Sequence, residues 1–564
     1  MSGYARNERS SQTHRSWAPL TRLTPLVAIH LSALAILLWS EADWDARAAF
    51  ALTWGLLNFF WLTLLRRPFV SGALSLGMIV ILIVLSQFKH GVLMMTATFV
   101  DVMLVDRATF SFLIAFVPAL AWKIALAAPI MAGVLLALWQ LDPFRVRRSR
   151  AIVGFACWLL AVASLSVAVP LEREDEFLPH QYVSKFARSA AVAAIDISTR
   201  GVLEAAPAAR DGLKLADVAS CDTRRDLPHI VMVLDESSFD ATRMPGVIVP
   251  ERYRDRFRSS DGKLRSLVVE GAGGPTWFTE YNVLTGLSVR SYGRFAQSVT
   301  RLATGHVKRS FPEALRRCGY GTYSLYSWFG AFLGARAFQT AAGIEHFLDA
   351  PRLRAGPGDT DGFFYDHAIR IIAHEHRPVF VLAYLIANHF PWTYRHRPDL
   401  LADWVNTGNP AEIDEYLRRQ EMSLHDFTQF KHRLAQKFPD QHFLLVRFGD
   451  HQPLFAKHYV EPALDPSAIA QRILDRDARY FTTYYALEGV NFEPAELASA
   501  LDTLDAPYLP LVVLEAAGVP LDAAFAEQRK ILQRCQGIFY LCAGGAEARR
   551  FNRLLIDAGL IEDF

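Results

Sequence analysis

The sequence is poor in cysteine and carries little net charge. Only five of its 564 residues are cysteines, and their spacing does not resemble a zinc-binding cysteine cluster. The formal net charge is +2, so the chain lacks the basic excess that would indicate a nucleic-acid partner. No internal repeat or low-complexity tract stands out. What the chain has in abundance is hydrophobic residues, which make up 52% of it.

Long apolar runs are concentrated in the first 170 residues. Crossing a bilayer takes about 20 residues, and five runs approach that length. We expect them to form transmembrane helices at 23–40, 48–65, 69–86, 124–141 and 151–169. The first run follows an arginine-containing polar tail and precedes four more runs, so it does not resemble a cleaved signal peptide. The predicted organisation is a cytoplasmic tail (1–22), a five-helix transmembrane domain (23–170), a linker (171–226) and an extracytoplasmic domain (227–564).

Arginines mark every second connection between these runs. The tail, the loop with Arg66 and Arg67, and the loop spanning 145–150 are basic, whereas the first loop, "EADWDAR", is net acidic. Cytoplasmic loops are enriched in arginine and lysine, so the N-terminus is predicted to be cytoplasmic. Five crossings then place the residues after Val169 on the outer side.

The third loop, 87–113, is moderately apolar but is interrupted by Asp101, Asp106 and Arg107. Part of it would suit an amphipathic helix on the outer membrane surface. A partly re-entrant piece of the helical bundle is an equal alternative.

Four cysteines lie in the exported part, where disulfides can form. They are Cys221, Cys318, Cys535 and Cys542. The last two are close enough in sequence to pair, but the pairing cannot be deduced from sequence.

From residue 228 short β-branched runs alternate with helical patterns. Buried strands are predicted at 229–234, 321–327, 378–386, 442–448 and 508–514. Near-continuous apolar strands that alternate with helices indicate an α/β domain, with a mostly parallel sheet covered by helices on both faces. Chemistry in such sheets gathers at the carboxyl ends of the strands.

Polar residues follow three of these predicted strands. Glu236 follows the first strand, His389 the third, and the Asp450–His451 pair the fourth; Thr276 follows a glycine-rich turn and opens a helical pattern. Each residue alone is more often a helix cap or a loop residue, and a helix N-cap is the preferred interpretation of neighbouring Asp235. Together, however, they suit a divalent metal site of carboxylates, imidazole and hydroxyl.

Four motifs, in order, resemble a known family. "VLDES", "GGPTWFTEYNVLTG", "NHFPW" and "RFGDHQP" are similar to the sulfatase-like membrane transferases of the alkaline phosphatase superfamily, such as lipoteichoic acid synthase and the phosphoethanolamine and phosphoglycerol transferases. Those proteins also join five transmembrane helices to an extracytoplasmic catalytic domain. The resemblance therefore implies a bacterial inner-membrane protein whose catalytic domain faces the periplasm.

The resemblance also implies roles for single residues. Glu236, Thr276, Asp450 and His451 would bind Zn²⁺ or Mn²⁺, with Thr276 as the nucleophile. His389 resembles the histidine that holds the substrate phosphate. Arg336 is a candidate phosphate contact, although its surroundings depart from the family's aromatic-x-Arg-Asp pattern.

The implied activity is transfer of a phosphoethanolamine or phosphoglycerol group. The donor would be a membrane phospholipid, the acceptor an envelope glycan or lipid, and the intermediate a phosphothreonine. A hydrolase with water as acceptor, either a phosphodiesterase or a sulfatase, is the alternative. The chain lacks the C/S-x-P-x-R motif of sulfatases proper, which argues against sulfate ester hydrolysis. A non-enzymatic membrane sensor is a third class, and the complete metal set argues against it.

Overall fold

The computed structural model describes residues 23–562 except 94, 105, 117, 170, 172–177, 208–220, 222–226 and 357. The predicted cytoplasmic tail, 1–22, lies outside the described residues. The chain divides into two compact units. The first comprises Met1–Ser86, Pro118–Leu171 and His180–Ala191; the second comprises Gln87–Val117, Glu172–Pro179 and Val192–Phe564.

Helices occupy all five predicted apolar runs. They are α2 (Thr24–Ser40), α3 (Trp44–Leu65), α4 (Pro68–Leu93), α6 (Pro118–Leu141) and α7 (Arg148–Ala168). Among the described residues, four of these helices, namely α3, α4, α6 and α7, are long and apolar enough to cross a membrane. Helix α2 is apolar but has only 17 residues. The fifth crossing therefore stays a prediction.

The two arginine-rich loops of the first unit lie side by side. The Val146 N–H donates to the Arg66 carbonyl at 3.0 Å. Arg67 donates to the Asp142 carbonyl at 2.8 Å, and its guanidinium lies 4.8 Å from the centre of the Trp139 ring. The loops that the arginine pattern assigns to one side of the membrane are thus in contact.

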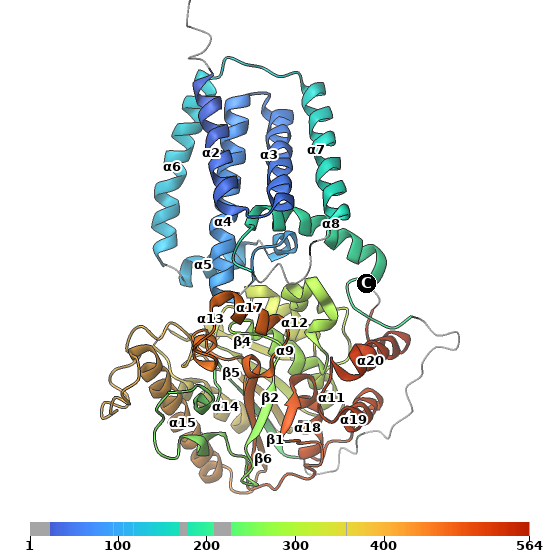
Figure 1. Cartoon of the computed structure of the whole chain (residues 1–564). Helices are drawn as coiled ribbons and strands as arrows, with labels where there is room; N and C mark the ends of the chain where they lie inside the picture. The colour runs from blue at the N-terminus through green and yellow to red at the C-terminus, as the bar shows by residue number, and fades with distance from the viewer. Residues whose placement is uncertain are drawn as a thin grey trace, which may run out of the picture. The chain divides into compact units, whose positions relative to one another are not determined.

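The second unit is built on one eight-stranded sheet (Figure 1). Its strands are β1 (His229–Asp235), β2 (Arg265–Val268), β3 (Gly321–Tyr326), β4 (His346–Asp349), β5 (Val379–Tyr384), β6 (Phe443–Gly449), β7 (Thr482–Val490) and β8 (Thr503–Asp505). The spatial order is β4-β3-β5-β1-β6-β7-β2-β8. Strand β7 runs antiparallel to β6 and β2, and the other neighbours are parallel. The sheet is therefore mixed, with a parallel centre as predicted.

Both faces of the sheet are buried by helices. Val231 and Val233 of β1 pack in one apolar cluster with residues of α14 (Asp361–His374) and α15 (Ala411–Lys437). Their neighbours Ile230 and Met232 pack in the opposite cluster, with residues of α9 (Thr276–Thr285) and α19 (Ala523–Cys535). Because alternate residues of a strand point to opposite faces, one strand contributes to both clusters.

One predicted strand is wrong. Residues 508–514 belong to η8 (Ala506–Tyr508) and α18 (Leu509–Ala516), and all eight residues of α18 are buried. A helix that is buried on every side shows no polar face, so its sequence resembles that of a buried strand. Short strands β2, β4 and β8 and antiparallel β7 were not predicted.

Helical segments also form in the third loop and in the linker. The loop contains η1 (Phe99–Leu104) and α5 (Arg107–Phe116), and the linker contains α8 (Tyr182–Arg200). A helix in the loop agrees with the amphipathic interpretation, whose location on the membrane surface stays a prediction.

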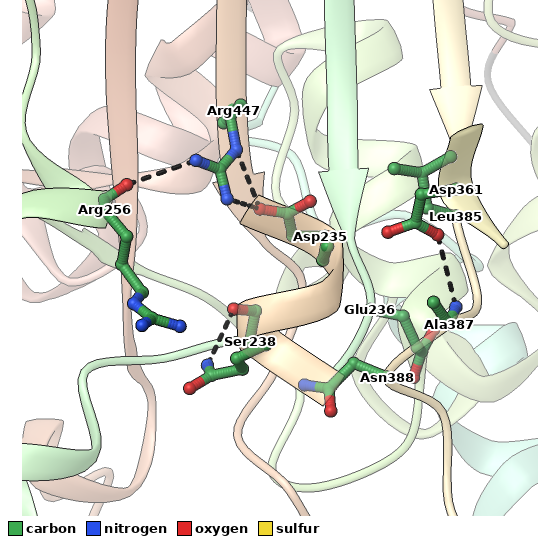
Figure 2. Close-up of a pocket in the computed structure, with 11 residues that line it drawn as sticks. Asp235, Glu236, Ser238, Arg256, Asp361, Leu385, Ala387, Asn388 and Arg447 are labelled. Carbon is green, nitrogen blue, oxygen red and sulfur yellow. Dashed lines mark hydrogen bonds and ion pairs between the residues drawn. The ribbon is translucent and has the colours of Figure 1, made fainter. Parts of the chain in front are cut away.

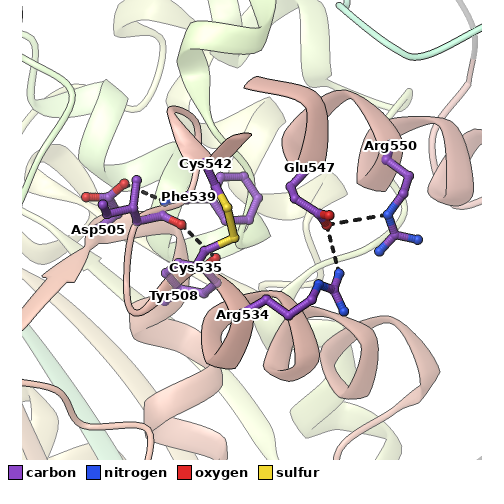
Figure 3. Close-up of a disulfide and its surroundings, with 9 residues drawn as sticks. Asp505, Tyr508, Arg534, Cys535, Phe539, Cys542, Glu547 and Arg550 are labelled. Carbon is purple, nitrogen blue, oxygen red and sulfur yellow. Dashed lines mark hydrogen bonds and ion pairs between the residues drawn. A yellow bond between two sulfur atoms is a disulfide. The ribbon is translucent and has the colours of Figure 1, made fainter. Parts of the chain in front are cut away.

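Two disulfides cross-link the second unit. One joins Cys221 to Cys318, and the other joins Cys535 to Cys542. Figure 3 shows the second bridge beside Tyr508, whose hydroxyl donates to the Ile538 carbonyl at 3.1 Å. The bridge closes the turn that follows α19.

Peptide mapping without reduction should recover both bridges. We expect one peptide pair that contains Cys221 and Cys318 and another that contains Cys535 and Cys542, with Cys157 alkylated as a free thiol. A peptide that joins Cys318 to Cys535 or Cys542 would contradict this pairing.

Candidate active site

Three segments bring the predicted metal ligands together. Glu236 follows β1 directly, and Asp450 follows β6 directly. Strands β1 and β6 are parallel neighbours in which Asp235 is aligned with Gly449. The register therefore places the two following carboxylates beside each other. Thr276 is the first residue of α9.

The four side chains converge on one buried point. The Thr276 hydroxyl lies 3.3 Å from Glu236 Oε2 and 3.2 Å from His451 Nε2. His451 Nε2 also lies 3.1 Å from Asp450 Oδ2 and 3.3 Å from Glu236 Oε1. All four residues are buried, and Asp450 is 0% exposed.

Hydrogen bonds that involve main-chain groups hold these residues in place. The Ser237 N–H donates to Asp450 Oδ1 at 2.7 Å, and the Thr279 hydroxyl donates to the Asp450 carbonyl at 2.6 Å. His451 Nδ1 lies 2.8 Å from the Gln452 carbonyl. Donation from Nδ1–H to that carbonyl leaves the lone pair of a neutral imidazole on Nε2, which faces the other three residues.

Glycines allow the segments to approach closely. Gly273, in the turn before Thr276, has φ +59°, a left-handed conformation that side chains disfavour. A Cβ on Gly449 would lie 1.9 Å from the Ser238 carbonyl oxygen, so no side chain fits there.

The start of α9 is less open than the sequence suggests. A glycine-rich turn that leads into a helix predicts free N–H groups that face an anion. The N–H groups of Thr276 and Phe278 instead donate to the carbonyls of Gly274 and Pro275, at 3.0 and 2.9 Å. Local bonds therefore use part of this donor set.

Comparison with known proteins agrees with the motifs. Residues 269–473 match the family model described as Sulfatase. The chain contains a sulfatase-family domain. The matched segment of this domain includes Thr276, His389, Asp450 and His451, and Glu236 lies before it. The predicted resemblance is thereby confirmed.

Solved structures that match the chain include two transferases and one synthase. Phosphoglycerol transferase GacH of Streptococcus pyogenes, in complex with sn-glycerol-1-phosphate, is 14% identical; the match covers 61% of this chain and 87% of that one, with a TM-score of 0.47. Lipooligosaccharide phosphoethanolamine transferase A of Neisseria meningitidis is 14% identical, with coverage of 88% and 94% and a TM-score of 0.45. Lipoteichoic acid synthase LtaP of Listeria monocytogenes is 15% identical, with coverage of 54% and 76% and a TM-score of 0.36. No curated protein matches the chain. These identities and scores are too low to transfer an activity.

His389 lies in the loop after β5. Burial alone would raise the pKa of Glu236, but hydrogen bonding with His451 and the electrostatic effects of His389 and His451 hold it below its ordinary value. The His389 ring stacks on Phe390 at 4.6 Å, and Nδ1 lies 2.7 Å from the Phe390 carbonyl. Arg419 donates to the His389 carbonyl at 2.8 Å and holds the loop. These contacts fix the orientation of the His389 imidazole and hold its loop in place.

Arg336 forms its ion pair and its ring contact with residues of β4. It is the second residue of α12 (Ala335–Ala341), forms an ion pair with Asp349, and lies over the Phe347 ring at 4.8 Å. These contacts tie Arg336 to β4 rather than to the converging residues. Its role as a phosphate contact stays a prediction.

Asp235 is not the helix cap that the sequence suggests. It is buried and accepts from Arg447 Nη2 at 2.6 Å and from the Tyr484 hydroxyl. Its Oδ1 has no hydrogen-bond partner among the described residues and lines a small polar cavity with Asp361 and Asn388 (Figure 2). A buried arginine–carboxylate pair therefore lies directly before Glu236.

For Glu280 the sequence alone allows a supporting role or a solvated side chain equally. The structure buries it one helical turn after Thr276, where it accepts from Gln339 Nε2 at 3.0 Å. Burial raises the pKa of the Glu280 carboxyl to about 7, and the Gln339 hydrogen bond offsets this only in part. The sequence contains no signal of this partner, which is 59 residues away.

The converging residues fit a divalent cation. One ligand atom each from Glu236, Asp450 and His451 lies within 4.8 Å of the others, and Asp450 Oδ2 accepts no hydrogen bond from the described residues. Burial and the negative charge of Glu236 raise the pKa of Asp450. Two buried carboxylates this close are stabilised either by protonation of one of them or by a positive charge between them. Carboxylate oxygens with one imidazole suit Zn²⁺ or Mn²⁺.

Removing one ligand should lower metal affinity. In Glu236→Gln and Asp450→Asn, we expect the affinity for added Zn²⁺ or Mn²⁺ to fall at least about 100-fold, because even indirect contacts to a metal are worth about 10- to 100-fold. Isothermal titration calorimetry of the chelator-treated protein measures this metal affinity. Glu280→Gln, an equally small change at a buried carboxyl, serves as the control and should bind metal normally. Unchanged binding in both ligand variants would contradict the site.

Arg447→Ala should destabilise the second unit. It leaves the Asp235 carboxylate buried without its partner, which typically costs about 3–5 kcal/mol. Arg433→Ala removes an arginine from a pair that is 48% and 43% exposed, worth about 0–1 kcal/mol. Urea unfolding followed by tryptophan fluorescence measures the free energy of unfolding of both variants. An equally small loss in both would show that the Asp235–Arg447 pair is not important for stability.

Proposed function

We propose that the protein is a metal-dependent phosphotransferase that moves a phosphoethanolamine or phosphoglycerol group from a membrane phospholipid to an envelope glycan or lipid. The observation that carries this proposal is the Thr276 hydroxyl, buried at 3.3 Å from a Glu236 oxygen and 3.2 Å from His451 Nε2. A structural threonine has no need of two ionisable partners at the end of a helix. The sulfatase-family match supports the same reaction class.

The residues suit a double displacement. When bound, a Zn²⁺ or Mn²⁺ ion would supply charge neutralisation at the phosphoryl group and make the threonine hydroxyl easier to ionise. Thr276 Oγ1 gives its proton to Glu236 and attacks the donor phosphorus. The bond to the diacylglycerol oxygen breaks, and His389 protonates that oxygen. The product on the enzyme is a phosphothreonine diester.

The second displacement restores the enzyme. His389, now neutral, takes the proton from the acceptor hydroxyl, whose oxygen attacks the phosphorus. The bond to Thr276 breaks, and Oγ1 recovers its proton from Glu236. Buried surroundings favour this sequence because they keep competing water away from the diester.

The same proposal includes five membrane crossings and an extracytoplasmic second unit. Helix α2 would extend about 26 Å, which is close to the about 30 Å of the hydrocarbon core. The contact between the two basic loops agrees with a common cytoplasmic side for them. The chain would then be a bacterial inner-membrane protein whose site faces the periplasmic side, where disulfides form.

Thr276→Ala should abolish transfer. In vesicles with labelled phosphatidylethanolamine or phosphatidylglycerol, we expect metal-dependent diacylglycerol release to fall by on the order of 10³-fold or more, since the nucleophile is lost. Thr285→Ala makes the same change at the other end of α9 and should retain release. Intact-mass analysis of trapped wild-type protein should show a head-group adduct on Thr276.

The hydrolase alternative gives a different pattern. Release of phosphate or sulfate from soluble esters, with the phospholipids untouched, would contradict the proposal. Equal diacylglycerol release by Thr276→Ala and wild type would exclude the phosphothreonine intermediate.

A further inference from the structure

The third loop is part of the same compact unit as the sulfatase-family domain. Gln87–Val117 falls in the second unit. Within it, η1 packs against η5 (Val289–Ser298), and α5 packs against η6 (Phe332–Gly334). The loop is therefore a docked part of the domain.

Charged side chains of this loop form ion pairs within the second unit. Lys89 forms an ion pair with Asp101 at 2.8 Å, with side chains only 13% and 17% exposed. Arg301 of α10 (Val299–Ala303) forms an ion pair with Asp106 and donates to the Met103 carbonyl at 2.6 Å. Arg301 thus joins the loop to the domain.

Apolar side chains of the loop face outward. Phe99, Val102, Met103 and Phe110 are 44–51% exposed. Residues three apart share a face of a 3₁₀-helix, so Phe99 and Val102 lie on one side of η1. A protein surface in water shows the reverse arrangement, with charges outside and large apolar groups inside. Contiguous apolar exposure indicates a contact with lipid or protein.

The helices at both ends of the loop indicate that the apolar side chains contact lipid rather than protein. The loop leaves one candidate membrane span, Pro68–Gly91, and leads into the next, Leu120–Leu141. The end of one span and the start of the next lie at the same bilayer surface. A short loop that joins them therefore lies at that surface. Apolar groups there can insert into the boundary between head groups and acyl chains.

We propose that Phe99, Val102, Met103 and Phe110 insert into the lipid surface and that Arg301 links this lipid contact to the sulfatase-family domain. These four residues form the apolar face of the loop. The inference rests on the membrane location in the proposed function, but not on the transferase reaction.

Depth measurement by spin labelling tests the lipid contact. Phe99→Cys and Val102→Cys are labelled separately in a Cys157→Ser background, with both disulfides left intact, and reconstituted in phosphatidylcholine–phosphatidylglycerol vesicles. We expect both labels to collide more with dissolved oxygen than with a water-soluble nickel chelate. Val405→Cys, at a position 81% exposed in the same unit, should show the opposite preference.

Two outcomes would overturn the proposal. Labels at 99 and 102 that prefer the nickel chelate, as at 405, would show that the apolar face meets water. Immobilised labels that neither reagent reaches would show that protein, such as a second copy of the chain, covers it.

The Arg301 link has its own test. Arg301→Gln should lower transfer from a bilayer phospholipid by about fivefold and leave transfer from a short-chain, water-soluble phospholipid unchanged. Arg433→Gln, which removes another partly exposed ion pair, should change neither. Equal rates for Arg301→Gln and wild type on bilayer donor would overturn the link. If wild type used neither donor, the proposed reaction would fail while the label depths would still decide the lipid contact.

Discussion

The repulsion between two buried carboxylates is the constraint on which the second unit depends. Parallel pairing of β1 with β6 aligns Asp235 with Gly449, so Glu236 and Asp450 follow side by side. Separating them would cost the register of the two central strands, whose residues are almost fully buried. The sheet therefore forces the charges together. A bound cation would compensate them, with the neutral His451 imidazole as a further ligand.

Sequence patterns predicted the centre of the sheet and the residues at its edge. Four predicted runs became β1, β3, β5 and β6, in which nearly every residue is buried. The position of Glu236 and of Asp450–His451 at strand ends follows from that assignment. The same rule was wrong for 508–514, since α18 is also buried all round and period alone cannot distinguish it.

Partners that are far apart in the sequence could not be predicted from it. Asp235 pairs with Arg447, 212 positions away, and Glu280 with Gln339. Each residue has an ordinary local interpretation, as a cap or a surface group, until the fold supplies the partner. The membrane part shows a different limit, because α2 matches its predicted run but falls short of the length that defines a span.

The steric position of Gly449 affects how related sequences can be recognised. Any β-carbon there would collide with the Ser238 carbonyl oxygen and push the turn after β1 away from β6. An Asp-His pair occurs by chance in many proteins, whereas Gly-Asp-His at the end of a buried strand also meets a packing requirement. Searching for that triplet would separate chains able to assemble such a centre from chains that merely contain the two ionisable residues.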